Sequence, residues 1–362
     1  MNLIESHFEI YIAKDSKIKN AHLLVHSDKL GIHLNLAGGN AKDEIINPDQ
    51  PYFMASVGKL FTSVLFGILY EKRKLDYNDK INKFIPPDIM KDLHVYKGKD
   101  YSNDIKIKHL LNHTSGLHDY FDDKPKNTKP FIDIILEEKD RMWSPVKVIA
   151  WSKNNLKPHF PPGKGFHYSD TGYQLLGLII EKLCGMPFHE ALREHIFKPL
   201  NMNNSFLLHH SEPTEKSEFP VAGVYMGEKN VINHKSLSVD YAGGGIVSTS
   251  EDMLLFLQSI VKGKIISEST FKIMQDWAGF FNIQFMGIDY GYGLMKFKAI
   301  PLFLPEKYSI WGNAGSTGAF MFYNPRYDTY CIGTLNQFRY HSKGVRMVFK
   351  NLAIIAKGNI NY

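Results

Sequence analysis

The sequence predicts an α+β fold in which one antiparallel sheet, flanked by helices, is built from both ends of the chain around a mostly helical inserted region. Two observations carry this prediction. Runs rich in β-branched and aromatic residues lie near the amino end and again in the last quarter, whereas the middle has apolar residues at helical spacing. Strands and helices segregated along the chain in this way are typical of the α+β class.

The 362 residues are expected to form a single domain over 1–362. Its sheet part should comprise about 1–60 and 285–362, because the strand signals gather there. Its helical part should comprise about 61–284. A functional site is expected in the seam between the two parts.

Local patterns predict the elements in chain order. Residues 21–39 form a hairpin, because two apolar-rich runs flank a Ser27-Asp28-Lys29 turn. An apolar helix then runs from about Leu60 to Tyr70. Helical segments follow in the middle of the chain at 109–117, 145–155, 171–185 and 250–263. The chain then closes with strands at 291–299 and 307–315, a hairpin at 319–337 and an amphipathic helix at 341–356.

Composition and charge exclude several classes of protein. Hydrophobic residues make up 44% of the chain and charged residues 22%, which is typical of a globular protein and not of a disordered one. The net charge of +6 is spread among acids and bases and forms no basic stripe, so we expect no nucleic-acid partner. Cys184 and Cys331 have no metal or redox spacing, so we expect two buried thiols, no metal and no cofactor.

The sequence shows no membrane or export signal. The longest apolar runs are shorter than the roughly 18–20 residues of a spanning helix, so no integral membrane segment is expected. The first residues lack the basic start and apolar stretch of a signal peptide. The chain is therefore cytosolic, or its printed start follows a removed signal or anchor. Both alternatives, and the oligomeric state, stay open.

The pattern Ser-x-x-Lys occurs five times, and only Ser56 and Lys59 have the setting of an active site. There a short polar start gives way to an apolar helix, so the two side chains share one helix face. A serine hydroxyl needs a base to become a nucleophile, and a lysine amine is such a base when burial leaves it neutral. The hydroxyl would also lie where free backbone N–H groups favour developing negative charge.

Five segments, in this order, resemble the serine β-lactamase-related family. They are SVGK at 56–59, LLNHTSGL at 110–117, FPPGKGFHYSDTGYQLLGLIIEKLCG at 160–185, AGGGIVSTSEDMLLF at 242–256 and WGNAGSTGAF at 311–320. The family includes class C β-lactamases, D-alanyl-D-alanine carboxypeptidases and other penicillin-binding proteins, D-aminopeptidases and carboxylesterases. The resemblance implies a β-lactamase/transpeptidase-like fold and a metal-independent serine hydrolase that works through an acyl-enzyme.

The resemblance assigns Ser56 as the nucleophile, Lys59 as its basic partner and Tyr168 as a proton relay. Tyr101 begins a literal Tyr-x-Asn motif, but Tyr168 has the family's surroundings, with a Pro-Gly turn before it and TGYQLLG after it. We therefore choose Tyr168. A phenol held against the serine and the lysine can move protons into the attack and out to the leaving group.

Asp170 stands where the family has asparagine. Asparagine donates an N–H to a substrate carbonyl, whereas an ionised carboxylate only accepts. The negative charge beside Lys59 would also favour the ammonium form and weaken the lysine as a base. Three outcomes stay open: Tyr168 takes over as base, Asp170 is protonated, or the enzyme is slower.

Asn313, Ala314 and Gly315 fill the position of the family's Lys-Thr-Gly or His-x-Gly motif. Together with Asp170 they are the predicted substrate-binding residues. The N–H groups of Ser56 and Ser316 would then form the oxyanion hole, in which each donor is commonly worth about 3–4 kcal/mol.

The replacement of the family's Lys-Thr-Gly or His-x-Gly motif by Asn313-Ala314-Gly315 affects which substrate is expected. In the family, a basic group at the position of Asn313 helps to hold a substrate carboxylate through a charge-assisted hydrogen bond. Unless Arg326 or Arg339 reaches the site, carboxylate-bearing β-lactams and D-Ala-D-Ala ends should bind poorly. The prediction is an esterase, amidase or peptidase acting on D-amino-acyl groups of a small-molecule or cell-envelope-derived substrate, with weak β-lactam reactivity.

Two alternatives to this function stay open. One is a catalytically impaired sensor or binding module with a penicillin-recognising fold, supported by the two altered motifs. The other is a true β-lactamase or D-alanyl-D-alanine carboxypeptidase.

Three further features have structural interpretations. His113, within HTSG, is expected to cap and pack a helix in the manner of the family. The run Gly243–Gly245 lacks the strand–turn–helix setting of a phosphate loop, so we expect close packing beside the site. His209 and His210 have no partner at metal spacing and are expected in an exposed loop.

Overall fold

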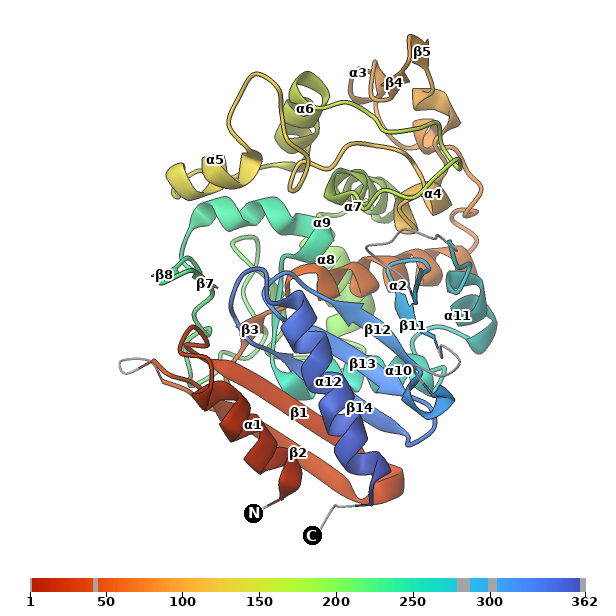
Figure 1. Ribbon diagram of the computed structural model, residues 1–362. Coiled ribbons are helices and arrows are strands. Elements are labelled where there is room, and N and C mark those ends of the chain that lie inside the picture. The colour runs from red at the N-terminus through yellow and green to blue at the C-terminus, as the bar shows by residue number, and fades with distance from the viewer. Residues whose placement is uncertain (1, 42–44, 279–286, 299–304, 359–362) are drawn as a thin grey trace.

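A seven-stranded antiparallel sheet joins the two ends of the chain in the computed structural model, which describes residues 2–41, 45–278, 287–298 and 305–358 (Figure 1). The strand order is β10-β11-β12-β13-β14-β1-β2, so the first strand pairs with the last. The strands are β1 (Ala21–Ser27), β2 (Ile32–Gly38), β10 (Ile288–Tyr290), β11 (Met295–Phe297), β12 (Ile310–Ala314), β13 (Phe320–Asn324) and β14 (Thr329–Thr334). This arrangement confirms the predicted fold class.

The alternation of side chains along β1 places one core on each face of the sheet. Leu23 and Val25 pack with one apolar cluster, whereas Leu24 between them belongs to the other. The register is fixed across the central pair, where Leu24 lies opposite Ile332 of β14. A shift of one residue would exchange the two faces, so the pattern determines the pairing.

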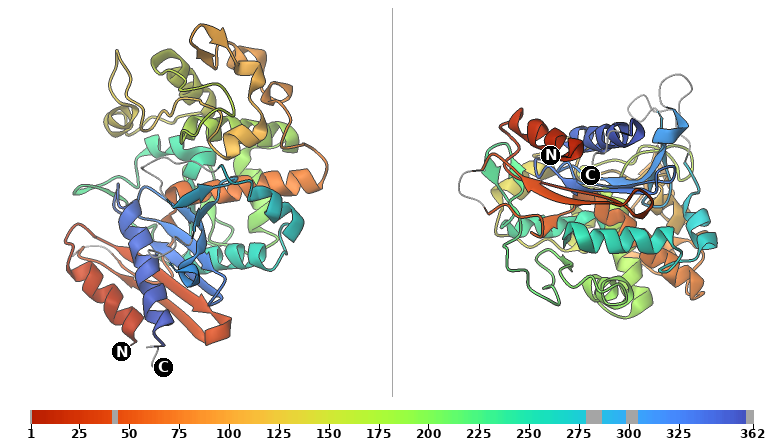
Figure 2. Two further views of the ribbon diagram at one scale, coloured as in Figure 1. Left: turned by 45° about the vertical axis from the view of Figure 1, so that its right-hand side comes forward. Right: turned by 90° about the horizontal axis from the view of Figure 1, so that it is seen from below.

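Helices cover both faces of the sheet (Figure 2). The helices α1 (Leu3–Ala13) and α12 (His341–Ala356) lie side by side on one face. The helices α2 (Gly58–Glu71) and α10 (Ser250–Val261) pack on the other. The bounds of α12 match the prediction, and α2 is longer than predicted by a few residues. Helix α1 was not predicted, although the buried residues of this helix, Ile4, Phe8 and Ile12, recur at every fourth position.

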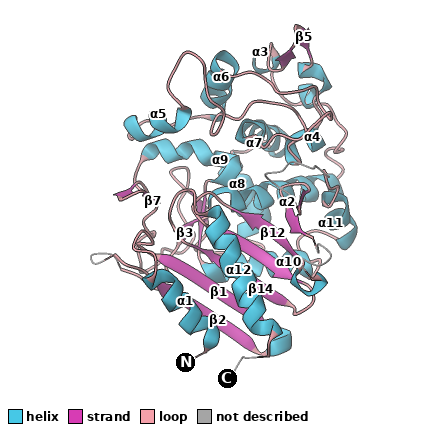
Figure 3. Ribbon diagram, viewed as in Figure 1, coloured by secondary structure: helices cyan, strands magenta, loops and turns pink. Residues whose placement is uncertain are grey.

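Most of the helices in the middle of the chain lie above the large sheet in the view of Figure 3. These helices are α3 (Pro87–Met90), α4 (Ile107–Leu111), α5 (Phe131–Glu137), α6 (Pro145–Asn155), α7 (Asp170–Cys184), α8 (Phe188–Leu192) and α9 (Tyr241–Gly244), with α11 (Glu268–Met274) near the sheet. A small sheet, not predicted, has the order β3-β9-β6, with strands β3 (Tyr52–Phe53), β9 (Ile246–Ser248) and β6 (Phe206–Leu207). Two short hairpins complete the list: β4 (Val95–Tyr96) with β5 (Lys99–Asp100), and β7 (Tyr225–Met226) with β8 (Lys229–Asn230).

The structure also tests predictions about strand bounds, cysteine burial and membrane segments. The strand expected over 291–299 is confined to Met295–Phe297, and residue 299 lies outside the described residues. Cys331 is a buried free thiol as predicted, but Cys184 is only half-buried. No helix within the described ranges combines the length and apolarity needed to cross a bilayer. The division into a sheet part and a helical part stays a prediction.

Candidate active site

Ser56 lies in a tight turn, Ala55–Val57, directly before α2. Ala55 adopts a left-handed conformation with φ of 46°, which an L-residue with a side chain adopts at a cost. Two glycines pack against this turn. A Cβ on Gly244 would lie 2.7 Å from the Ala55 carbonyl carbon, and a Cβ on Gly315 would lie 3.1 Å from the Ser56 nitrogen. Only glycine lets these segments approach so closely, so they define where the serine stands.

Lys59, in the first turn of α2, is fully buried beside Ser56. Its Nζ lies 3.2 Å from Ser56 Oγ and 2.7 Å from the carbonyl oxygen of Gly243, and it forms an ion pair with Asp170. An ammonium has three N–H donors, and these three oxygens use all of them. The three contacts of Lys59 Nζ therefore match the three donors of a lysine ammonium.

Tyr168 completes the predicted catalytic group. It precedes α7, whose N-cap is Ser169, and its ring centroid lies 4.9 Å from Lys59 Nζ. Burial and the Asp170 charge raise the pKa of Tyr168 well above its usual value, while a hydrogen bond with Ser56 opposes this shift. The phenol is therefore protonated at neutral pH and can act as a proton donor, not as the resting base.

His113 positions Tyr168. The two rings stack with centroids 4.1 Å apart, and His113 Nδ1 accepts a hydrogen bond of 3.1 Å from the Ser169 N–H. Burial lowers the pKa of His113 well below its usual value, so the ring is neutral. Its contacts fit the structural role that the sequence predicted.

Carboxyl groups surround Asp170. Its backbone N–H donates to Asp119 Oδ1 at 2.9 Å, at the start of α7. Burial, and next the charge of Asp170, raise the pKa of Asp119, of Asp122 and of Asp240, the last to about 7. Each of these shifts reports a neighbour of the same charge. The site therefore holds more carboxyl groups than Lys59 can pair with, and the raised pKa values favour the neutral form of Asp119, Asp122 and Asp240.

The two predicted oxyanion donors are backbone N–H groups that face no acceptor. Among the described residues, neither the Ser56 N–H nor the Ser316 N–H makes a hydrogen bond, although the chain around them is hydrogen-bonded. Gly315 N, for example, donates to Ala319 O at 2.8 Å. Free donors beside a nucleophile are what an oxyanion hole requires.

The side-chain amide of Asn313 makes hydrogen bonds within the protein. Asn313 is fully buried at the end of β12, its Nδ2 donates to Gly293 O at 2.8 Å, and its Oδ1 accepts from the Ala314 N–H at 2.8 Å. Its side chain therefore supplies no cation and shows little spare donor capacity for a substrate. The substrate-binding roles of Asn313, Ala314, Gly315 and Asp170 stay predictions.

Known proteins are similar to this chain in sequence. The beta-lactamase family model matches residues 25–350. The chain belongs to the beta-lactamase family. Penicillin-binding protein 4* of Bacillus subtilis (strain 168) is 29% identical over 285 residues, which cover 72% of this chain and 54% of that protein. The beta-lactamase of Escherichia coli (strain K12) is 24% identical over 230 residues, covering 64% and 53%. The chain spans about half the length of the curated relatives it matches.

Solved structures share the fold over nearly the whole chain. The D-amino acid amidase from Ochrobactrum anthropi SV3 superposes with a TM-score of 0.77 at 22% identity, covering 97% of this chain and 99% of that one. An octameric penicillin-binding protein homologue from Pyrococcus abyssi gives a TM-score of 0.75 at 23% identity, covering 98% and 77%. These likenesses confirm the β-lactamase/transpeptidase-like fold predicted from the motifs.

The other residues considered for the site of this beta-lactamase-family chain lie in different parts of the structure. The rejected tyrosine, Tyr101, contacts His94 and Lys99 near the β4–β5 hairpin. Arg326 lies beside Lys29 at the outer end of β1. Arg339, in contrast, is exposed, and its charge opposes the rise in the pKa of Asp122 that burial and Asp170 cause.

The predicted exposure of two histidines near the site was wrong, and two aspartates near Asp170 were not predicted. His209 and His210 are half-buried and not exposed, because His210 packs edge-on against Tyr241. Asp119 and Asp240 were not predicted as neighbours of Asp170, although its charge raises the pKa of both after burial does. Asp240 directly precedes the segment that includes Gly243–Gly245, and that adjacency was the signal available for it.

We expect Gly243→Ala to impair the site without unfolding the protein. An added Cβ would lie 3.1 Å from Asp170 Oδ1 and 3.6 Å from Lys59 Nζ, so the Asp170 carboxylate would have to shift by a few tenths of an ångström. Because a displacement of 1 Å commonly costs about 100-fold in rate, this smaller shift should lower kcat/KM by about 10-fold. The matched control is Gly172→Ala in α7, where the nearest atoms to the new methyl lie at 3.6 Å or beyond. Equal activity of the two variants would contradict the packing role.

Proposed function

We propose that this chain is a serine hydrolase that forms an acyl-enzyme on Ser56 and cleaves esters or amides of D-amino acids bearing a free α-ammonium group. The observation that carries the proposal is the charge of the site. Asp170 pairs with Lys59 beside the nucleophile, the charges of both act on Asp240, and Asn313 offers no cation. A substrate ammonium complements this charge, whereas a substrate carboxylate is repelled.

The resting contacts suggest how Ser56 is activated. Lys59 already carries its three protons, so it can accept the Ser56 proton only as it passes one of its own to Asp170. The Ser56 Oγ–carbon bond then forms, and the carbonyl electron pair moves onto the oxygen held by the N–H groups of Ser56 and Ser316. The carboxylate that replaces the family's asparagine thereby becomes the terminal proton acceptor.

Release of the two products follows the same proton path. When the tetrahedral intermediate collapses, the bond to the leaving group breaks and Tyr168 donates its hydroxyl proton to that group. Tyr168 regains a proton from the Lys59–Asp170 pair, which returns to its charged form. Water then attacks the acyl-enzyme by the same steps and frees Ser56.

A screen of substrates tests the proposal. D-phenylalanine amide, its L-enantiomer, its N-acetyl derivative, p-nitrophenyl acetate, a D-Ala-D-Ala peptide and nitrocefin are compared on wild type and Ser56→Ala. We expect the free D-aminoacyl amide to have the highest kcat/KM, and Ser56→Ala to cleave none of them. Fast turnover of nitrocefin would overturn the proposed specificity. A stoichiometric burst without a steady state would instead identify an impaired sensor.

One observation favours a second candidate, a β-lactamase or carboxypeptidase. The charge of Arg339 acts on Asp122, whose pKa the Asp170 charge also raises, so a guanidinium near these carboxyl groups could hold a substrate carboxylate. In that case Arg339→Ala would lower kcat/KM for the D-Ala-D-Ala peptide, and D-phenylalanine amide would be the poorer substrate. Under the first proposal, Arg339→Ala leaves turnover of the amide within a few-fold of wild type.

Asp240 should make ammonium recognition pH-dependent. Its pKa is raised to about 7, so the carboxyl is neutral below this pH and charged above it. With D-phenylalanine amide, kcat/KM should therefore rise through pH 7 and fall again when the substrate amine loses its proton, near pH 8 for an ordinary α-amino group. Asp240→Asn should remove the rise and lower kcat/KM by about 10- to 100-fold above pH 7, the value of one hydrogen bond to a charged group.

The N-acetyl substrate is the control for this prediction. It carries no charge, so its turnover should not depend on Asp240. Because a raised carboxyl pKa means that the folded state loses stability as the pH rises from about 4 to about 7, Asp240→Asn should not lower the melting temperature above pH 7. Equal losses on both substrates would show that Asp240 acts on the fold or the chemistry and not on the ammonium group.

A further inference from the structure

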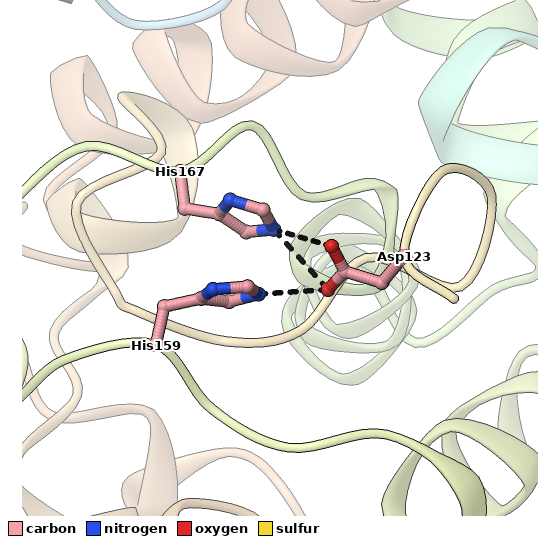
Figure 4. A group of neighbouring side chains, drawn as sticks. All are labelled: Asp123, His159 and His167. Carbon is pink, nitrogen blue, oxygen red and sulfur yellow. Dashed lines mark hydrogen bonds and ion pairs between the residues drawn. The ribbon is translucent and has the colours of Figure 1, made fainter. Parts of the chain in front are cut away.

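Two imidazole rings converge on one carboxylate outside the catalytic group. His159 Nε2 lies 2.8 Å from Asp123 Oδ2, and His167 Nε2 lies 3.2 Å from both Asp123 oxygens (Figure 4). The two rings stack with centroids 3.6 Å apart, so both Nε2 atoms point the same way. One donor atom from each residue fits within a span of 4.8 Å. This geometry brings three potential ligand atoms to one point.

Backbone hydrogen bonds fix the loop that carries the two histidines. His159 N donates to Gly116 O at 2.8 Å, Gly163 N donates to Thr114 O at 2.7 Å, and His167 N donates to His113 O at 3.0 Å. The 159–167 segment is thus held along 113–116 at both ends and in the middle. The two imidazoles are therefore positioned by the main chain before any ligand arrives.

The carboxylate is oriented in the same way. Asp123 Oδ2 accepts a 2.8 Å hydrogen bond from the Asp119 N–H, and Asp123 N donates to Asp119 O at 3.1 Å. Outer hydrogen bonds that orient a coordinating carboxylate are a regular feature of metal sites. The cluster therefore has an outer hydrogen bond in place as well as three donor atoms.

We propose that Asp123, His159 and His167 form a binding site for a divalent transition-metal ion, with Zn²⁺ as the best match. Two imidazole nitrogens and one carboxylate oxygen are a ligand set that Zn²⁺ accepts, with the remaining position left to water. Donor atoms about 3 Å apart suit an ion held at roughly 2.0–2.2 Å from each. The side chain of His159 is 37% exposed, which gives the ion a way in.

The site is separate from the hydrolytic chemistry but built on the same segments. His167 directly precedes Tyr168, and Asp119 links the Asp123 carboxylate to the Asp170 N–H. A bound ion would replace two hydrogen bonds by coordinate bonds and tie the 159–167 loop to the 119–123 turn. We expect it to stabilise this corner of the fold, and no proton step passes through it.

A zinc titration tests the proposal on the full-length, tag-free chain. After treatment with EDTA and removal of the chelator, ZnCl₂ is added and binding is followed by calorimetry and by thermal melting. We expect one Zn²⁺ per chain, and a melting temperature that rises with free Zn²⁺. Replacing a ligand, in His159→Gln or Asp123→Asn, should weaken the affinity by at least about tenfold.

A second histidine pair in the chain supplies the control. His26 and His33 lie 3.1 Å apart between their Nδ1 atoms at the surface. His33→Gln should bind Zn²⁺ like wild type. If His33→Gln abolishes binding while His159→Gln does not, or if wild type binds no ion stoichiometrically, the proposal is wrong.

Misfolding of the variants would not leave the proposal untested. Melting curves without metal show whether each variant is folded. Co²⁺ bound to the wild type reports its own ligands independently: a four- or five-coordinate site with nitrogen ligands gives strong visible absorption, whereas an ion held only by water and carboxylates gives weak bands. Weak bands would overturn the assignment.

Discussion

Ser56→Ala should abolish turnover of every substrate while leaving the fold intact. The side chain stands in a turn that two glycines pack against, and alanine has the same backbone requirements, so the structural cost is small. Lys59 and Tyr168 both act through the serine hydroxyl, so no other group can take over the attack. Removal of the nucleophile from a serine hydrolase lowers kcat by on the order of 10⁶-fold. The measurement is steady-state hydrolysis of D-phenylalanine amide, with melting temperature as the test of folding.

A second serine controls for nonspecific effects. Ser63, further along α2, is buried and its side chain interacts with Tyr173, which has no assigned part in the proton transfers. Ser63→Ala should therefore keep activity within a few-fold of wild type. Residual turnover by Ser56→Ala above about 1% of wild type, far more than the loss of a nucleophile allows, would show that another group attacks.

Asp170→Asn is the next most damaging substitution, although it restores the residue that the family uses. In the wild type, the carboxylate accepts the proton that Lys59 releases as it takes one from Ser56. Asparagine cannot accept it, so Lys59 must first become neutral. The rate at pH 7 should fall by about 10²- to 10⁴-fold, the usual contribution of a general base. The activity of Asp170→Asn should recover as the pH rises, while wild type stays active near neutrality.

The neutral ester p-nitrophenyl acetate separates this effect from ammonium binding, because it has no charge for Asp170 to attract. Asp170→Glu keeps a carboxylate and should retain part of the rate. If Asp170→Asn is as fast as wild type at pH 7 on the ester, the terminal acceptor is not Asp170, and Tyr168 or a neutral Lys59 takes the proton.

Much of the fold could be predicted because its signals are local. The first hairpin and the helices α6 and α12 were predicted from apolar periodicity and turn residues within one window. The missed helix α1 has the same kind of signal, with buried Ile4, Phe8 and Ile12 at helical spacing. The small β3-β9-β6 sheet has strands of two or three residues, which are too short to show alternation.

Within the site, too, the residues that lie in local sequence motifs could be predicted and the others could not. Ser56, Lys59 and Tyr168 could be predicted as neighbours because each lies in a recognisable motif, and the altered motif placed the Asp170 charge beside Lys59, where the structure has an ion pair. Asp240 was not predicted because only its adjacency to the Gly243–Gly245 segment points to it, and its charge meets that of Asp170 only in the fold. Asp123 and His159 are 36 positions apart, and only the folded 113–116 segment brings them together.

The most direct test of the account is to trap the acyl-enzyme and find the residue that carries it. D-phenylalanine methyl ester is mixed with the protein, quenched in acid within the first turnovers, and analysed by intact mass and peptide mapping. We expect one D-phenylalanyl group per chain, attached to Ser56 and absent from Ser56→Ala. An adduct on another residue, or turnover with no adduct under conditions that trap acyl-enzymes of known serine hydrolases, would contradict the account.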